Sequence, residues 1–404
     1  EWHNLKLVRL RPEVAQKLRR QSFYSESSHC TLIQLRMMRL SQCRKRTLIA
    51  SAIVVATICS DGAAVSGWQL LPLLALLHLL AAVVGSWMAL RTCLIRAYCR
   101  LPLPLNFISR AWGRCHSRPL PRLARAPVYR LYSRLCSCDL TEADCQGLAD
   151  FNSLAEFFSR SLRPGLRPVC PTSDLVSPAD GRVLSLGRVY AGHLEQVKGI
   201  TYSLQGFLGP QPIGEFDKNQ TLPSNHKASS SDGPYLEGLR RLPGTQLFHC
   251  TIYLAPGDYH RFHSPADWLV LARRHFPGRL LSVAPPVAAC VAGLFCVNER
   301  AVFVGEWRHG FFSMTAVGAT GVGSISVACD PELATNRGAK QAGPAGFADR
   351  RLQPNPRFGK GEPFGQFNLG STVVLVFEAP EQFQFAATAG QKIRVGQSFG
   401  WVHS

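Results

Sequence analysis

The sequence predicts an α+β fold, in which N-terminal helices anchor the chain in a membrane and a mainly antiparallel β domain follows. One observation is an apolar segment that lies between two Arg-rich segments near the start of the 404-residue chain. The other is a series of short β-branched, aliphatic and aromatic runs, separated by glycines, from Ser177 onward. The length is sufficient for two domains, or for one large domain with appendages.

The net charge of +19 is concentrated around the apolar segment. Residues 1–46 contain 11 Lys and Arg against 3 acids, and residues 91–138 contain 10 Arg and no acid. Basic residues on both sides of an apolar segment are typical of a chain that meets anionic lipid. A nucleic-acid-binding protein would carry Lys, Arg and aromatic residues across its folded part, so we expect no nucleic acid partner.

Residues 1–46 are rich in arginine and serine, which is typical of a mitochondrial presequence, although a disordered basic tail is the alternative. Residues 47–92 form the expected transmembrane region. Within it, residues 70–90 match the length of a helix that crosses a ~30 Å hydrocarbon layer. Residues 47–59 are shorter, so one span is expected, with two as the alternative. A buried core helix is disfavoured, because arginines flank a segment that is apolar on every face.

Residues 93–150 are expected to be an Arg-rich, membrane-proximal connector of short helices and turns. A helix is expected within residues 139–168, because Asp139 and Thr141 offer N-cap chemistry and apolar residues recur at helical spacing. The β domain follows, interrupted by polar stretches at 211–245 and 331–360, which we expect to be surface loops.

Several short motifs contain residues that could carry chemistry. "SPADGRV" places Asp180 in a turn before a strand, and "APGDYHRFHSP" places His260 and His263 three positions apart. A His pair could bind metal, but no third ligand is near in sequence and the 14 cysteines contain no C-x-x-C pair, so no metal site is predicted. One His as a general base is the alternative to a ligand pair. A turn or bulge is needed to bring both rings into one site, because strand alternation separates them.

Ser371 follows Gly370 and opens the apolar run "TVVLVF". Asp180, His263 and Ser371 supply the residue types of an orienting acid, a base and a nucleophile. Such a relay attacks either an external ester, as in a membrane-bound serine acyl hydrolase, or its own backbone. An acyl-hydrolase serine usually lies in G-x-S-x-G at a strand-to-helix turn. Ser371 has glycine only before it and opens a strand, which favours self-processing. An inactive membrane scaffold is the third alternative, and the presence of all three residues argues against it.

Nine segments, in order, resemble the mitochondrial type of the phosphatidylserine decarboxylase family, over about residues 151–404. They are "FFSRSLRPGLRPV", "SPADGRV", "VKGITYSL", "YLAPGDYHRFHSP", "HFPGRLLSV", "CVNER", "GFFSMTAVGATGVGSI", "KGEPFGQFNLGST" and "GQKIRVGQSFG". One departure is Gly321, where the family commonly has Asn.

The resemblance implies that residues 151–404 are a catalytic domain that cuts itself between Gly370 and Ser371. The hydroxyl of Ser371, activated by His263 with Asp180 as orienting acid, attacks the Gly370 carbonyl and yields a large chain to residue 370 and a small chain, 371–404. Ser371 becomes a covalent pyruvoyl cofactor, which no metal assists.

That pyruvoyl group forms a Schiff base with phosphatidylserine and releases CO2 and phosphatidylethanolamine. Within this reaction His260 is our candidate for stabilising the imine or transferring protons, and a strand histidine that is hydrogen-bonded to backbone is the alternative. The resemblance places the protein in the mitochondrial inner membrane with the catalytic domain facing the intermembrane space, and its partners are membrane lipids and the two processed chains.

Overall fold

The computed structural model describes residues 93, 95, 104–197, 199–209, 233–321, 324–337, 345–368 and 371–402. The expected presequence, the expected transmembrane region at 47–92, and Leu369 and Gly370 lie outside these residues. Within the described ranges, no helix is long and apolar enough to cross a membrane.

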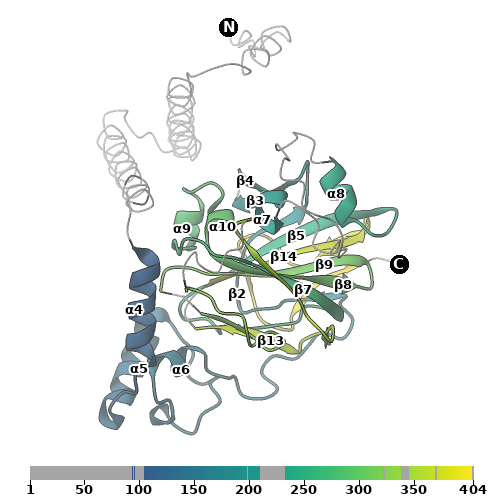
Figure 1. Ribbon diagram of the computed structural model, residues 1–404. Coiled ribbons are helices and arrows are strands. Elements are labelled where there is room, and N and C mark those ends of the chain that lie inside the picture. The colour runs from purple at the N-terminus through teal and green to yellow at the C-terminus, as the bar shows by residue number, and fades with distance from the viewer. Residues whose placement is uncertain are drawn as a thin grey trace, which may run out of the picture. The chain divides into compact units, whose positions relative to one another are not determined.

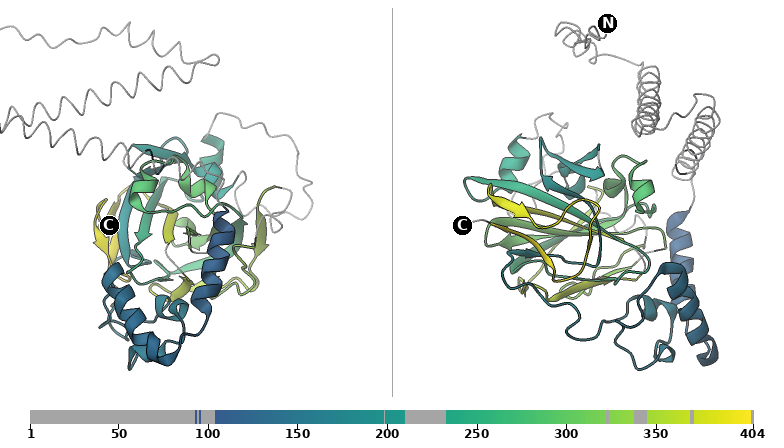
Figure 2. Two further views of the ribbon diagram at one scale, coloured as in Figure 1. Left: turned by 90° about the vertical axis from the view of Figure 1, so that its left-hand side faces the viewer. Right: turned by 180° about the vertical axis from the view of Figure 1, so that it is seen from behind.

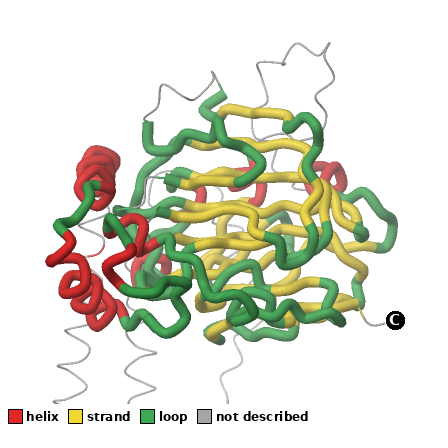
Figure 3. Tube along the Cα trace, turned by 90° about the horizontal axis from the view of Figure 1, so that it is seen from below, coloured by secondary structure: helices red, strands yellow, loops and turns green. Residues whose placement is uncertain are grey.

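Helices α4 (Leu105–Ser117) and α5 (Arg122–Cys136) form the described part of the connector and lie at one edge of the β domain (Figures 1 and 3). The short α6 (Leu154–Phe158) packs against them. Tyr129 of α5 is fully buried, stacks on Phe157 at 4.7 Å between ring centroids, and donates its hydroxyl to the Phe151 carbonyl at 3.0 Å. This aromatic cluster fixes the connector helices to the chain that leads into the sheet.

The helix expected within residues 139–168 is largely absent. That range contains only the 3-10 turn η1 (Leu148–Asp150) and α6. Asp139 accepts hydrogen bonds from the amide and hydroxyl of Thr141, which closes a turn instead of capping a helix. The true N-cap is Ser153, whose Oγ accepts from the amide of Glu156 at 3.2 Å.

The β domain is built around a nine-stranded sheet with the order β11-β7-β8-β9-β14-β5-β2-β16, and β12 also pairs with β7. All pairs of named strands are antiparallel, which confirms the predicted α+β, mainly antiparallel fold. The strands of this sheet are β2 (Gly181–Arg188), β5 (Thr245–Leu254), β7 (Trp268–Phe276), β8 (Arg300–Trp307), β9 (Gly310–Val317), β11 (Ala348–Arg351), β12 (Arg357–Phe358), β14 (Ser371–Pro380) and β16 (Lys392–Ile393).

Among the described residues, three smaller sheets and four short helices complete the domain (Figures 1 and 2). The sheets are β10-β13-β6 (Ile325–Val327, Pro363–Phe367, Arg261–His263), β1-β17-β15 (Leu175–Val176, Ser398–Val402, Phe383–Phe385) and β3-β4 (His193–Val197, Ile200–Ser203). The helices are α7 (Leu204–Leu208), α8 (Gly233–Leu239), α9 (Pro285–Ala288) and α10 (Leu294–Val297). Residues 331–360, expected to be a surface loop, contain β11 and β12, because their backbone extends the edge of the nine-stranded sheet beside β7.

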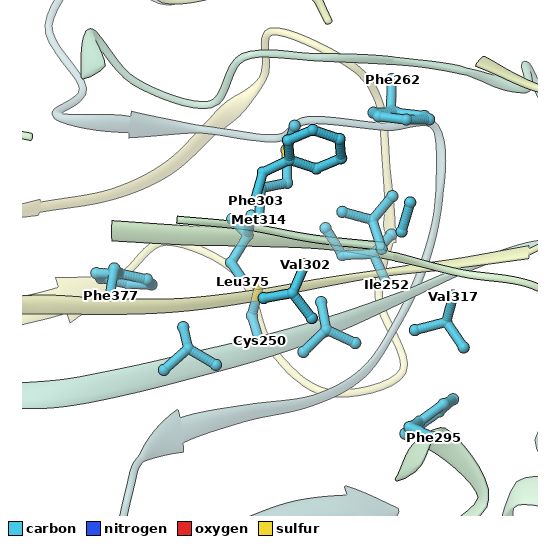
Figure 4. Packing of buried hydrophobic residues seen from close by; sticks show 14 of the residues in the cluster. Cys250, Ile252, Phe262, Phe295, Val302, Phe303, Met314, Val317, Leu375 and Phe377 are labelled. Atoms are coloured by element: carbon cyan, nitrogen blue, oxygen red, sulfur yellow. The ribbon is translucent and has the colours of Figure 1, made fainter. Parts of the chain in front are cut away.

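The hydrophobic core fills both faces of the nine-stranded sheet (Figure 4). Phe262 and Phe303 lie on one face and Val317 and Phe295 on the other. Strand β14 is buried over its first nine residues, since β5 and β9 flank it and side chains cover both faces. An unbroken apolar run is what such a central strand requires.

The chain passes between the nine-stranded sheet and the sheet β10-β13-β6 at three neighbouring places. Residues 255–260 join β5 to β6, residues 318–324 join β9 to β10, and residues 368–370 join β13 to β14. In one sheet β14 lies between β5 and β9, and in the other β13 lies between β6 and β10. We refer to the described residues of these connections, 255–260, 318–321, 324, 368 and 371, as the crossing region.

Candidate active site

Ser371 is the first residue of β14 and lies in the crossing region. It pairs with Leu254 of β5, and its neighbour Thr372 pairs with Val317 of β9. The side chain of Ser371 is fully buried, and its Oγ has no hydrogen-bond partner among the described residues. An unpartnered buried hydroxyl costs about 1–3 kcal/mol, so its presence needs an explanation beyond packing.

His260 lies beside Phe367, the last residue of β13, which precedes Ser371 by four residues. The amide of Phe367 donates to the His260 carbonyl at 2.9 Å. The fully buried imidazole packs on Phe158 at 4.0 Å between ring centroids, and burial lowers its pKa to about 3. Nδ1 lies 2.8 Å from the Asp258 carbonyl, which can only accept, so Nδ1 carries the proton. The lone pair is therefore on Nε2, which is buried without a described partner.

His263 ends β6 and has the same tautomer. Its Nδ1 donates to the Gly361 carbonyl at 2.9 Å, and its Nε2 accepts from the hydroxyl of Tyr259 at 3.1 Å. Burial lowers the pKa of His263, whereas the Gly361 carbonyl and the charge of Asp180 oppose that shift. Burial also raises the pKa of Tyr259 to about 12, so the phenol remains a donor at neutral pH.

Asp180 precedes β2 and is 7% exposed. Both of its oxygens bind Arg167, whose Nε lies 3.1 Å from each and whose Nη2 lies 2.5 Å from Oδ2. The amide of Val395 also donates to Oδ1 at 2.8 Å. Arg167 pairs in addition with Glu142 at 2.6 Å. Burial alone would lower the pKa of Arg167, but hydrogen bonds to the two carboxylates raise it above its usual range.

The structure brings Asp180 and His263 together. The amide of His263 donates to the Pro178 carbonyl at 2.7 Å, so the "SPADG" turn lies directly against the end of β6. Among the described residues, however, no hydrogen bond joins Asp180 to His263, or His263 to Ser371. The Gly361 carbonyl accepts the Nδ1 hydrogen bond that orients the imidazole, a role that we expected for Asp180. Gly370, on the other side of the expected cleavage bond, lies outside the described residues.

The two histidines have separate partners and do not share a site for an ion. Within the described ranges, no group of three or more His, Cys, Asp or Glu side chains is arranged to hold a metal.

Three site residues escaped the sequence analysis as individual positions: Tyr259, Arg167 and the carbonyl of Gly361. Tyr259 and Arg167 lie within two of the nine segments that resemble the family, and their hydrogen-bonding side chains could have identified them as candidates. A backbone carbonyl has no sequence signal.

The comparisons with known proteins identify the family. The family model described as phosphatidylserine decarboxylase matches residues 154–401. The mitochondrial phosphatidylserine decarboxylase proenzymes of Cricetulus griseus and Rattus norvegicus are each 48% identical over 301 residues, which covers 74% of this chain and 72% of theirs. Phosphatidylserine decarboxylase proenzyme 1, mitochondrial, of Saccharomyces cerevisiae is 37% identical over 378 residues, covering 76% of this chain and 74% of its own.

The fold and these matches define a self-processing lyase. The chain belongs to the phosphatidylserine decarboxylase family. The resemblance drawn from the nine segments is thereby confirmed, and neither the acyl hydrolase nor the inactive scaffold is favoured.

Proposed function

We propose that this chain converts phosphatidylserine to phosphatidylethanolamine and CO2 after it cuts its own backbone between Gly370 and Ser371. The observation that carries the proposal is the buried, unpartnered hydroxyl of Ser371 at the start of the central strand β14. A serine kept only for packing would be replaced at little cost by alanine. A nucleophile must instead have its oxygen free of other donors.

His263 is the base in this proposal. Once Tyr259 no longer occupies it, Nε2 of the neutral ring accepts the proton of the Ser371 hydroxyl. Oγ then forms an ester with the Gly370 carbonyl carbon as the peptide C–N bond breaks, and the proton passes from Nε2 to the departing Ser371 nitrogen. The Gly361 carbonyl keeps the proton on Nδ1, which fixes the tautomer. The negative charge of Asp180 favours the imidazolium that forms, since that charge raises the pKa of His263. Asp180 acts electrostatically here and does not need a direct hydrogen bond.

The surroundings of Ser371 fit a pyruvoyl group. Conversion removes a buried hydroxyl that lacks a partner among the described residues, and the start of the small chain, 371–404, stays paired with β5 and β9 on either side. A pyruvoyl ketone supplies the electron sink that loss of CO2 requires and that no ordinary side chain provides. No metal is part of this proposal.

His260 serves decarboxylation in this proposal. Its carbonyl is bound to the strand that leads to Ser371, and its neutral Nε2 is a free acceptor in an apolar setting against Phe158. Such a nitrogen accepts a hydrogen bond from the amine of the substrate and holds that amine beside residue 371. Because burial keeps the ring neutral, it does not repel the cationic amine.

The connector helices support a membrane partner. Large apolar side chains of α4 and α5 are exposed to solvent, beside basic residues such as Arg122 and Arg134; they are Phe107 (59%), Trp112 (50%), Leu123 (94%), Leu131 (59%) and Leu135 (76%). In α5 the three leucines recur at multiples of four residues and form one stripe, as in helices that lie in a lipid interface.

We place the protein in the mitochondrial inner membrane, with the catalytic domain in the intermembrane space. The mitochondrial relatives and the basic, presequence-like residues 1–46 support this location. The proposed boundaries are a presequence at 1–46, a transmembrane region at 47–92 with its span at 70–90, a connector at 93–150 and a catalytic domain at 151–404.

The test is intact-mass analysis of the purified chain together with product analysis on phosphatidylserine vesicles. We expect a small chain of 34 residues with a carbonyl at its amino terminus, and conversion of the lipid to phosphatidylethanolamine. A single full-length chain that is nevertheless active would disprove self-processing, and a processed chain that leaves the lipid unchanged would disprove the proposed reaction.

A further inference from the structure

A pocket of about 640 Å³ opens between the connector helices and the crossing region. Arg110 and Arg114 of α4 line one side. Gly321 and Asn368 of the crossing region line another, and Arg337 lies on the loop that follows β10. Asn368 is three residues before Ser371 in the chain. The pocket is therefore three residues along the chain from the residue that we propose to be converted to the reactive ketone, which is itself fully buried and is not part of the lining.

The pocket is basic. The half-buried Arg110 donates through Nη1 to the carbonyl and Oδ1 of Asn336, at 3.3 and 3.4 Å, which aims its guanidinium without neutralising it. Within the described ranges, Arg110, Arg114 and Arg337 form no ion pair. Glu156 also lines the pocket, but its Oε2 accepts the amide of Asn152 at 2.7 Å. Three guanidinium groups thus face one carboxylate that a backbone amide already engages.

Specific hydrogen bonds fix α4 to the crossing region. The amide of Gly321, which has a φ of +81°, donates to Oγ of Ser109 at 3.0 Å. The side chain of Asn368 donates to Oγ of Ser324 at 2.6 Å, and the backbone amide of Asn368 donates to the Ser324 carbonyl at 3.1 Å. The arginines of α4 are consequently held at a defined place relative to the end of β13, as a binding site requires.

We infer that Arg114 and Arg337, oriented beside Arg110, bind the phosphate of the phosphatidylserine headgroup. This inference rests on the proposed function, because it assigns the anion to the substrate of that same site. In phosphatidylserine only two carbons and an ester oxygen separate the amine from the phosphorus. A headgroup whose amine meets residue 371 must therefore place its phosphate a few ångströms from it. The basic pocket is lined by Asn368, and the three residues from Asn368 to residue 371 span at most about 10 Å of extended chain.

The phosphate is assigned in preference to the carboxylate for an energetic reason. The carboxylate loses its charge as CO2 leaves, so an arginine on it would stabilise the ground state more than the transition state and slow the reaction. The phosphate keeps its charge throughout. Binding it stabilises both states equally and lowers KM without lowering kcat. Guanidinium groups also match phosphate oxygens in geometry.

The first experiment measures binding without catalysis. The full chain carrying Ser371→Ala remains uncut, and the probes are sn-glycero-3-phosphoserine, inorganic phosphate and free serine, each titrated by ligand-observed NMR. We expect Arg114→Gln/Arg337→Gln, the pocket variant, to raise the dissociation constant of glycerophosphoserine roughly tenfold or more. Arg118→Gln/Arg130→Gln, the control variant, removes the same charge from exposed positions outside the pocket and should leave that dissociation constant unchanged.

The probes separate the sources of the anion. Binding of glycerophosphoserine that exceeds that of inorganic phosphate, and that the pocket variant loses, supports a headgroup site. Equal binding of the two probes indicates a site for free phosphate only and overturns the assignment. An effect of equal size in the control variant would show bulk charge attraction, which also overturns it.

The second experiment uses the processed enzyme and monomeric dihexanoyl phosphatidylserine. We expect the pocket variant to raise KM roughly tenfold at unchanged kcat, with normal processing and an unchanged rate of hydroxylamine capture at residue 371. A fall in kcat at unchanged KM would place the arginines on the carboxylate and refute the phosphate assignment. If the unmutated enzyme is processed but does not turn over the lipid, the proposed function fails, whereas the binding titration still decides the anion site.

Discussion

The hydroxyl of Tyr259 lies 3.1 Å from Nε2 of His263 and occupies the only basic nitrogen of that ring. Nδ1 of the same ring is bound to the Gly361 carbonyl, so His263 enters self-cleavage with both nitrogens engaged. Before the ring can deprotonate Ser371, Nε2 must give up one hydrogen bond. Tyr259 is therefore a positioning residue that competes with Ser371 for the base.

The first prediction concerns this competition. Tyr259→Phe removes the competing hydroxyl and keeps the ring, so we expect self-cleavage at the original rate or a few times faster. His263→Asn keeps a donor for the Gly361 carbonyl but has no group at the Nε2 position, and should slow cleavage by roughly 10²–10⁴-fold. Appearance of the 34-residue chain after synthesis measures both rates. Cleavage lost in Tyr259→Phe would show that the phenol activates His263 instead of occupying it.

The pH dependence of maturation follows from the direction of the His263 pKa. Burial lowers that pKa from its ordinary value of about 6.5, so the ring is neutral and competent at pH 7 and above. Protonation stops the base only when the pH falls through the lowered value. We expect the rate constant to be flat from pH 8 to 6.5 and to fall at more acidic pH. A rate that has already halved above pH 6.5 would contradict a depressed pKa.

Ser371 and Thr372 form a matched pair of buried, unpartnered hydroxyls on successive residues of β14. Successive side chains of a strand point to opposite faces, so only one of the two can face His263. We expect Ser371→Ala to abolish the small chain and Thr372→Val to leave its formation unchanged, as measured by intact mass. Uncut protein in both variants would instead indicate that the start of β14 is sensitive to any change.

The strands were predictable where burial dictates composition. The run that forms β14 is apolar on both faces because β5 and β9 flank it and two layers cover it, and this alone marks a strand. The prediction of a helix within 139–168 was wrong because Asp139 accepts hydrogen bonds from Thr141 in a turn, so neither residue caps a helix. Strands β11 and β12 were missed because edge strands need no apolar run.

The site was predictable as residue types but not as contacts. Asp180, His260, His263 and Ser371 are reactive side chains within short motifs. The carbonyl of Gly361 reaches His263 through the antiparallel register of β6 and β13, in which Pro363 pairs with His263. Arg167 reaches Asp180 from thirteen residues earlier in the chain. Because β6 pairs with β13, the histidines lie beside the strand that leads to Ser371, although more than one hundred residues separate them in sequence.

His260 should separate self-cleavage from decarboxylation. His260→Asn keeps a donor for the Asp258 carbonyl but removes the acceptor at Nε2, whereas His260→Gln keeps a polar group at that end of the side chain. We expect both variants to be cut normally, with decarboxylation reduced by roughly 10²–10⁴-fold in the Asn variant and less in the Gln variant. The measurements are intact mass and CO2 release. Failure of the Asn variant to be cut would assign His260 to maturation.

Arg167 supports Asp180, and the chain offers a matched control for its effect. Asp180 is nearly buried, and Arg167 is the only cation with a described ion pair to it. Arg167→Gln leaves an uncompensated buried carboxylate, which costs about 3–5 kcal/mol in a typical case. Arg394 pairs with Glu142 at 3.3 Å through a side chain that is 66% exposed, so Arg394→Gln should cost less than about 1 kcal/mol.

Urea unfolding of both variants in the uncut Ser371→Ala background measures the difference. We expect a clearly lower midpoint for Arg167→Gln alone, with partial recovery in Arg167→Lys, which restores the charge but not the two-pronged geometry. Equal midpoints for Arg167→Gln and Arg394→Gln would mean that water, and not Arg167, compensates the charge of Asp180.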